Sequence, residues 1–341
     1  MKKMTKCINC GGGLIYSPTK ASIICEHCDS KYPMPAAKRA AKLVRKYSLD
    51  YVPETDEKFD NLFVCNTCNS LHMVADGKIS TRCPSCGDTN IVKSSSKTCF
   101  PDGLIPFTLE KEKAVSIFEK WLKKRSFAPN DLFALAKNGK ISKVYVPAFN
   151  ITGTSVCAYS AMVKKVHTDN DSGTIFSTMH TVQNVERDQI TNHALCANSV
   201  VDKKLFEKVS SVDPSKIVPF STEYLFGYYG ADTNCNIHDL MQDFKKDLED
   251  DCESSVRSKL NNKYDEIVHL SCSTELRDVV FNYVYVPVYM NHFTYKNKKY
   301  HCYISGTSGK VAGVAPKSAG KILALVGAIL LAIAAVVIAL I

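Results

Sequence analysis

The chain has 341 residues and a formal net charge of +9, enough length for two or three domains with buried cores. Hydrophobic residues make up 45% and charged residues 23%, which excludes a disordered or collagen-like protein. Fifteen cysteines is a high number. Their uneven placement, and a first segment without the apolar core of a secretory leader, do not fit a secreted disulfide scaffold. We therefore expect metal-bound thiolates in a reducing cytosol.

The positive charge is unevenly distributed. Residues 1–100 contain 15 Lys and Arg against 9 Asp and Glu (+6), residues 101–300 contain 25 of each, and residues 301–341 contain 3 against none. Two zinc sites with four thiolates each would add −4 + 2 = −2 apiece, which lowers the head to about +2. The net charge is therefore weak support for nucleic-acid binding.

Eight cysteines near the N-terminus form two copies of one spacing pattern, 58 residues apart. The copies are Cys7, Cys10, Cys25 and Cys28, and then Cys65, Cys68, Cys83 and Cys86. A pair of CxxC knuckles with this spacing is typical of a zinc ribbon, and Gly11, Gly12 and Gly87 permit the backbone angles of such knuckles. The pattern predicts two structural zinc ions in closed sites of four thiolates, with short strands between the knuckles.

The segment between the two ribbons is basic. Residues 35–46 are expected to form a short helix with a charged stripe of Lys38, Arg39, Lys42, Arg45 and Lys46. Three interpretations stay open for this stripe: contacts with nucleic-acid phosphates, contacts with anionic lipid headgroups, or simple solvation. A solvated linker helix is the favoured interpretation. Aromatic residues for base stacking are sparse in the head, which is weak support for a platform that binds single-stranded nucleic acid.

The sequence of residues 104–316 predicts an α+β body with a possible internal duplication, whose two halves are residues 104–215 and 216–316. Each half contains a Pro-Phe dipeptide, helical sequence and a Val-Tyr-Val-Pro strand. Helices are expected over residues 109–124 and 239–262. Pro147 and Pro287 end the two Val-Tyr-Val-Pro segments, and we expect them at strand ends or sheet edges because proline cannot donate to a ladder.

Residues 322–341 contain no charged or polar side chain. A helix of this length spans about 30 Å, the thickness of a bilayer's hydrocarbon core. Lys310, Lys317 and Lys321 precede it, so the positive-inside rule places the preceding chain in the cytosol. The segment predicts a C-terminal tail anchor in the cell membrane. Its small residues at Ala324, Ala328 and Ala332 could pack against another helix and so support oligomers, although the favoured interpretation is that these alanines are only compatible with a helix.

No catalytic motif stands out. Gly306-Thr307-Ser308-Gly309-Lys310 is expected to link strands rather than to form a phosphate-binding loop, and His193 with Cys196 is at most half of a metal site. The remaining cysteines are interpreted as isolated apolar residues or surface thiols: Cys99, Cys157, Cys235, Cys252, Cys272 and Cys302. A non-enzymatic role is favoured, and an unknown activity in the body is kept as an alternative.

The chain resembles a family of bacterial proteins described as TFIIB-type zinc-ribbon-containing, whose members often carry a primosomal-helicase label. Beyond the CxxC pairs, the residues that carry the resemblance are 104–107, Trp121-Leu122, 144–147, 219–228, 284–287, 295–300 and 304–313. The chain departs from the pattern at Ala148-Phe149, where an aromatic pair is expected. The missing phosphate loop contradicts a helicase. Some relatives are associated with membrane-stress assemblies containing phage-shock-type and stomatin- or flotillin-like proteins.

These observations predict six segments: ribbon 1 (1–34), a basic linker helix (35–60), ribbon 2 (61–92), a linker (93–103), the α+β body (104–316) and the membrane tail (317–341). The favoured function is a membrane-anchored cytosolic adaptor that binds membrane proteins or peripheral membrane-stress proteins. The bilayer itself is the second expected partner, through residues 322–341. The alternatives are a membrane-tethered nucleic-acid-binding protein and an enzyme in the body.

Overall fold

The computed structural model describes residues 6–35, 44–49, 57–58, 61–75, 82–94, 97–132, 141–169 and 173–340. It confirms a mixed α+β architecture with cysteine clusters near the N-terminus and an apolar helix at the C-terminus. Among the described residues, twelve strands form one hydrogen-bonded sheet, and smaller sheets of three and two strands lie beside it.

The strands and helices follow in chain order. The N-terminal strands are β1 (Leu14–Ser17), β2 (Ser22–Cys25), β3 (Lys31–Tyr32), β4 (Arg45–Lys46), β5 (Glu57–Lys58), β6 (Leu62–Cys65), β7 (Leu71–Val74), β8 (Ile91–Ser94) and β9 (Lys97–Thr98). The body begins with β10 (Gly103–Leu104), α1 (Lys111–Lys123), β11 (Ser142–Thr168), β12 (Ile175–Cys196) and α3 (Lys203–Val209). It continues through the 3-10 turns Pro214–Lys216 and Thr222–Leu225, β13 (Val218–Pro219), β14 (Tyr229–Ala231), α4 (Ile237–Asn261), β15 (Glu266–Tyr295), β16 (Lys298–Ser305), β17 (Val311–Gly313) and α5 (Ala319–Leu340).

The two Val-Tyr-Val-Pro segments pair with each other at the centre of the sheet. β11 and β15 are antiparallel, and Tyr145 lies opposite Pro287 while Pro147 lies opposite Tyr285. Side chains alternate across these strands, so the tyrosines enter the core that contains α1 and the valines enter the core that contains α3. Burial on both faces explains why these segments are apolar at nearly every position.

The prediction that Pro147 and Pro287 end strands was wrong, because both lie inside long strands. Each proline sits where its strand changes neighbours on the outer edge. β11 pairs with β14 up to Tyr145 and with β12 from Ala148 onward. β15 likewise changes from β10 to β16 across Pro287. The carbonyl of each proline accepts a hydrogen bond on this outer side, from Ala197 for Pro147 and from Gly306 for Pro287. Each proline therefore lies between two successive neighbouring strands, where the missing N–H interrupts neither ladder.

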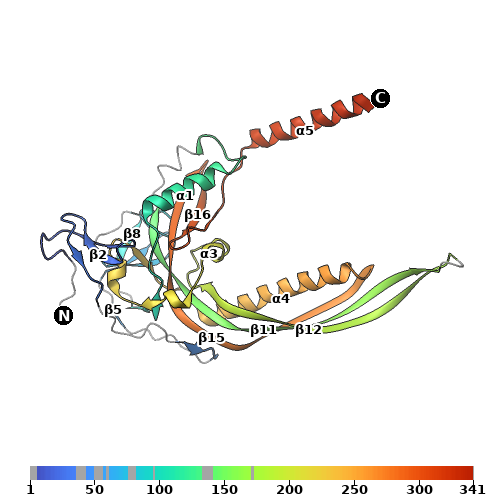
Figure 1. Cartoon of the computed structure of the whole chain (residues 1–341), viewed down its shortest axis with the longest axis horizontal. Coiled ribbons are helices and arrows are strands. Elements are labelled where there is room, and N and C mark those ends of the chain that lie inside the picture. The colour runs from blue at the N-terminus through green and yellow to red at the C-terminus, as the bar shows by residue number, and fades with distance from the viewer. Residues whose placement is uncertain are drawn as a thin grey trace.

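Beyond the central sheet, β11, β12 and β15 continue together as a long three-stranded arm. Figure 1 shows this arm curving away from the body with α4 lying along one of its faces. The helix expected over residues 239–262 corresponds to α4, whose apolar stripe buries Phe244, Val256 and Leu260. The far ends of β11 and β12 extend past α4 and form the tip of the arm.

Candidate metal centres

Four knuckles in the N-terminal head share one backbone geometry. In each CxxC, the amide of the residue after the second cysteine donates to the carbonyl of the first cysteine, over N···O distances of 2.8–3.2 Å. That residue has a positive φ in every knuckle: Gly11 at 71°, Asp29 at 56°, Asn69 at 57° and Gly87 at 77°. Gly11 and Gly87 were predicted for this purpose, and Gly12 was predicted with them but has no positive φ. Asp29 and Asn69 were missed, although Asp and Asn also tolerate the left-handed region.

The knuckles bring the eight predicted cysteines together in two clusters of four. All four Sγ atoms of each cluster lie within 4.8 Å of one another. In ribbon 1 the Cys7–Cys28 and Cys10–Cys25 sulfurs are 3.6 and 3.5 Å apart. In ribbon 2 the corresponding Cys65–Cys86 and Cys68–Cys83 pairs are both 3.7 Å apart. A tetrahedral ion with metal–sulfur bonds of about 2.3 Å places its sulfurs about 3.8 Å apart, so each cluster fits one such ion.

Groups next to the sulfurs tune their chemistry. The Tyr32 hydroxyl lies 3.0 Å from the Cys7 sulfur and lowers the pKa of that thiol to about 6, which favours the thiolate that a metal requires. In ribbon 2, His72 is buried and its Nε2 lies 3.4 Å from the Cys83 sulfur. Burial lowers the pKa of His72 to about 3, so this ring is a neutral neighbour of the cluster at physiological pH.

Ribbon 1 is fixed against the body rather than held on a free linker. The Tyr16 amide donates to the Phe226 carbonyl at 2.9 Å. The Tyr16 ring also packs 5.0 Å from Tyr224 and 6.1 Å from Tyr228, measured between ring centroids. Ile15 lies so close to Gly227 that a Cβ there would be 3.0 Å from its side chain. These contacts set the orientation of the first cluster.

Ribbon 2 is part of the large sheet itself. Its strand β7 pairs antiparallel with β14, and the Asp232 amide donates to the Leu71 carbonyl at 2.9 Å. A second attachment involves the last knuckle, where His292 Nε2 lies 2.9 Å from the Pro84 carbonyl. The Nδ1 atom of the same ring lies 2.6 Å from Nδ1 of His301. Burial, and next the neighbouring His301, lowers the pKa of His292 to about 4.

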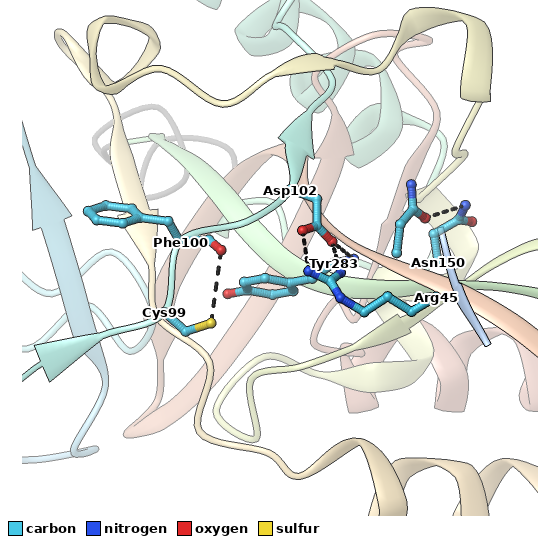
Figure 2. A network of polar contacts seen from close by, with 7 residues as sticks. Arg45, Cys99, Phe100, Asp102, Asn150 and Tyr283 are labelled. Atoms are coloured by element: carbon cyan, nitrogen blue, oxygen red, sulfur yellow. Dashed lines mark hydrogen bonds and ion pairs between the residues drawn. The ribbon is translucent and has the colours of Figure 1, made fainter. Parts of the chain in front are cut away.

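The predicted basic helix between the ribbons is wrong at its C-terminal end. Arg45 and Lys46 form β4, which pairs with β15. The Arg45 guanidinium forms a bidentate ion pair with Asp102. The Asp102 carboxylate also accepts a hydrogen bond from the Tyr283 amide at 2.9 Å. Figure 2 shows this arrangement, with the guanidinium turned toward Asp102. Lys38, Arg39 and Lys42 lie outside the described residues, so their expected helix is not addressed.

The interpretation of the other cysteines as isolated was wrong for three of them. Cys157 on β11 and Cys252 on α4 form a disulfide, and the Cys272 sulfur on β15 lies within 4.8 Å of both. The three positions are far apart in the sequence and meet only because α4 folds back over the arm. Sequence spacing carries no signal for such a cluster.

A cavity of about 500 Å³ opens between α4 and the arm beside this disulfide. Glu186, Asp188 and Asp251 line it together with His193. His193 stacks on Phe244 at a centroid distance of 4.6 Å, and burial lowers its pKa. His193 and Cys196, considered as at most half of a metal site, belong to no group of three or more potential metal ligands among the described residues.

The C-terminal helix α5 carries the other predicted site. Residues Ala319–Ile338 are long and apolar enough to cross a membrane, and none of this stretch is buried in the structure. Among the described residues, the helix is held at its base, where the Ser318 amide donates to the Phe127 carbonyl and Lys321 Nζ donates to the Ala128 carbonyl, both at 2.7 Å. Beyond that point α5 projects away from the body (Figure 1).

Comparison with known proteins gives one informative similarity. The chain is 24% identical to the uncharacterized protein YdjG of Bacillus subtilis (strain 168) over 322 residues, which covers 91% of this chain and 89% of that protein. No family model and no solved structure matches the chain. The similarity therefore extends over nearly the whole length of both chains.

Proposed function

We propose that the protein is a non-enzymatic adaptor that is anchored in the cell membrane by α5 and binds protein partners on the cytosolic side. We also propose that the protein belongs to the bacterial TFIIB-type zinc-ribbon-containing family that it resembles, and that its partners are proteins of a membrane-stress assembly. The observation that supports this proposal most strongly is that no part of the apolar stretch Ala319–Ile338 is buried against the body. An apolar surface of this size is unfavourable in water, and lipid is the covering that its length of about 30 Å fits.

The two tetra-cysteine clusters support a structural role for the head. We propose that each holds one zinc ion, because four thiolates in tetrahedral reach are the ligand set of closed structural zinc sites. Bound zinc would neutralise part of the thiolate charge and cross-link two hairpins that are too short to form a core of their own. With all four positions taken by sulfur, this chemistry leaves no position for a water or a substrate.

The arm supports the partner-binding part of the proposal. In the described residues, β12 pairs only with β11, so its outer edge offers unpaired backbone groups along most of its length. Its tip also exposes apolar side chains, with Ile175 71%, Phe176 51% and Met179 51% exposed. A long open edge with exposed apolar residues is a template for strand addition by another protein.

Affinity capture of the tagged full-length protein from solubilised membranes, with and without nuclease, tests this proposal. The adaptor interpretation expects partner proteins that survive nuclease and are lost in the arm variant Ile175→Ser/Phe176→Ser/Met179→Ser. Leu49→Ser is the matched control, because Leu49 is 78% exposed but lies outside the arm. Equal capture by wild type and the arm variant would contradict a partner site on the arm.

The same experiment separates the two rival functions. Loss of the captured material on nuclease treatment, and on changing Lys38, Arg39 and Lys42 to Ala, would favour a nucleic-acid tether whose affinity falls steeply with salt. The one observation on the side of an enzyme in the body is the cavity lined by three carboxylates and an imidazole. Asp188→Asn/Asp251→Asn should leave partner capture unchanged if the cavity has no part in the adaptor function.

A further inference from the structure

Three cysteines from three different elements meet on the face of the arm that α4 covers. Cys157 lies opposite Thr274 in the β11–β15 ladder, and Cys272 is two residues from Thr274, so both cysteines are on the same face of the sheet. Cys252 reaches this face from α4 and forms the disulfide with Cys157 across 95 residues of sequence. All three sulfurs lie within 4.8 Å of one another.

The position of Cys252 in the helix explains why it points at the sheet. The buried stripe of α4 runs through Phe244 and Val256 to Leu260, and Cys252 occupies the helical turn before Val256. On the sheet, Ala161 and Val163 complete the small apolar cluster with Val256 and Leu260. The disulfide therefore ties the helix to the sheet at the point where this cluster adjoins the cavity.

Small reagents can reach this cluster. Cys157 is buried, but Cys252 and Cys272 are only partly buried, and the disulfide forms part of the wall of the cavity of about 500 Å³. A disulfide in a chain that also needs eight reduced thiols for its metal clusters is unusual, because cytosolic disulfides are mostly transient or redox-sensing.

We propose that Cys157, Cys252 and Cys272 form a thiol–disulfide exchange site that sets which strand of the arm tethers α4. The Cys272 thiolate attacks the sulfur of Cys252, a new Cys272–Cys252 bond forms, and the Cys252–Cys157 bond breaks. Cys157 leaves as a thiolate and takes up the proton that Cys272 released, so the exchange involves no net oxidation. The first disulfide forms when hydrogen peroxide oxidises the Cys157 and Cys252 thiols and is itself reduced to two waters.

The exchange transfers the tether from β11 to the neighbouring strand β15. Because Cys272 lies two positions along the ladder from the residue opposite Cys157, the helix would shift across the sheet and change the wall of the cavity. Burial, and then Glu253 and Glu249 on α4, raises the pKa of the Cys272 thiol. This thiol is therefore a slow nucleophile at neutral pH, which keeps the Cys157–Cys252 bond in place as the resting state.

Peptide mapping without reductant tests the proposal on the full-length, metal-loaded protein in detergent. The protein is reduced, the reductant is removed, and hydrogen peroxide is added at a level that leaves the metal content unchanged. Wild type should yield the Cys157–Cys252 peptide pair, and Cys157→Ala should instead yield the Cys252–Cys272 pair. Cys235→Ser is the control, since this partly buried thiol before α4 should leave the wild-type pairing intact.

Two results would overturn the proposal. One is a Cys157→Ala protein in which Cys272 remains a free thiol while peroxide oxidises Cys252. The other is a third metal ion per chain on the reduced protein that is lost in Cys157→Ala, because the cluster would then be a three-thiolate metal site. Thermal unfolding of Cys157→Ala is measured beside that of wild type, so that a folding defect of the variant is recognised and not mistaken for either result.

Discussion

At the scale of single residues, Arg45 was considered as a contact for phosphates or lipid headgroups, but it forms an ion pair within the protein. Its guanidinium holds Asp102, whose side chain is only 10% exposed. We predict that Arg45→Ala destabilises the fold by about 1.5–3 kcal/mol, since it leaves a poorly solvated carboxylate without its charged donor. Thermal unfolding in detergent measures the loss. Lys46→Ala, the neighbouring exposed cation of β4, is the control, and an equal effect of the two changes would contradict the account.

Gly306 is required for a close approach rather than for an unusual φ. A Cβ there would lie 2.5 Å from the Phe107 ring and 2.8 Å from Pro287. The Gly306 amide donates to the Pro287 carbonyl, and the Gly306 carbonyl accepts from the amides of Thr108 and Leu109. We predict that Gly306→Ala costs about 1–3 kcal/mol through overpacking. Gly320→Ala, whose nearest contact would be 3.9 Å away, should have little effect in the same unfolding experiment.

At the scale of elements, the two ribbons are attached differently and should respond differently to metal loss. Ribbon 2 shares a ladder with β14, so removing its ion should loosen that pairing. We predict that Cys86→Ser lowers the metal content from about two ions per chain to about one and speeds hydrogen exchange at the Asp232 amide. Cys28→Ser should lower the metal content equally but leave that amide protected, because ribbon 1 forms a separate sheet.

Metal analysis and exchange by mass spectrometry measure both effects. Unchanged exchange at Asp232 in Cys86→Ser would show that β14 holds without the second cluster. A full metal complement in either variant would contradict the four-cysteine ligand sets. The comparison uses matched positions, since both cysteines are the last of their four.

The elements also show which features can be predicted from sequence. The ribbons follow from the sequence because a metal site fixes cysteine spacing within about thirty residues, and α4 follows from its apolar period. The arm does not follow, because a strand of 30 residues such as β15 is defined by partners far away in the chain. The Cys157–Cys252 bond is hidden for the same reason. The prediction for Pro147 and Pro287 was wrong because a proline needs an unpaired edge only at its own position. In β11 and β15 such an edge occurs inside the strand, where one neighbouring strand ends and the next begins.

At the scale of the whole molecule, a mixed α+β body carries a long arm and an apolar helix that is long enough to span a membrane. The ribbons are not free modules: ribbon 1 docks through Tyr16, and ribbon 2 lies in the main sheet. The Arg45–Asp102 pair fixes the end of the linker between them. This rigidity suits an adaptor that presents a binding surface at a defined position relative to the bilayer.

The central claim is that α5 lies in lipid, and alkaline carbonate extraction of membranes tests it most directly. Val326 and Leu330 lie within the exposed apolar stretch, and each arginine near the centre of a spanning helix costs about 2.5–3.5 kcal/mol. The account predicts that the full-length protein stays in the pellet, as does the control Val326→Leu/Leu330→Ile, whereas Val326→Arg/Leu330→Arg moves to the supernatant. Release of the wild-type protein by carbonate would contradict it.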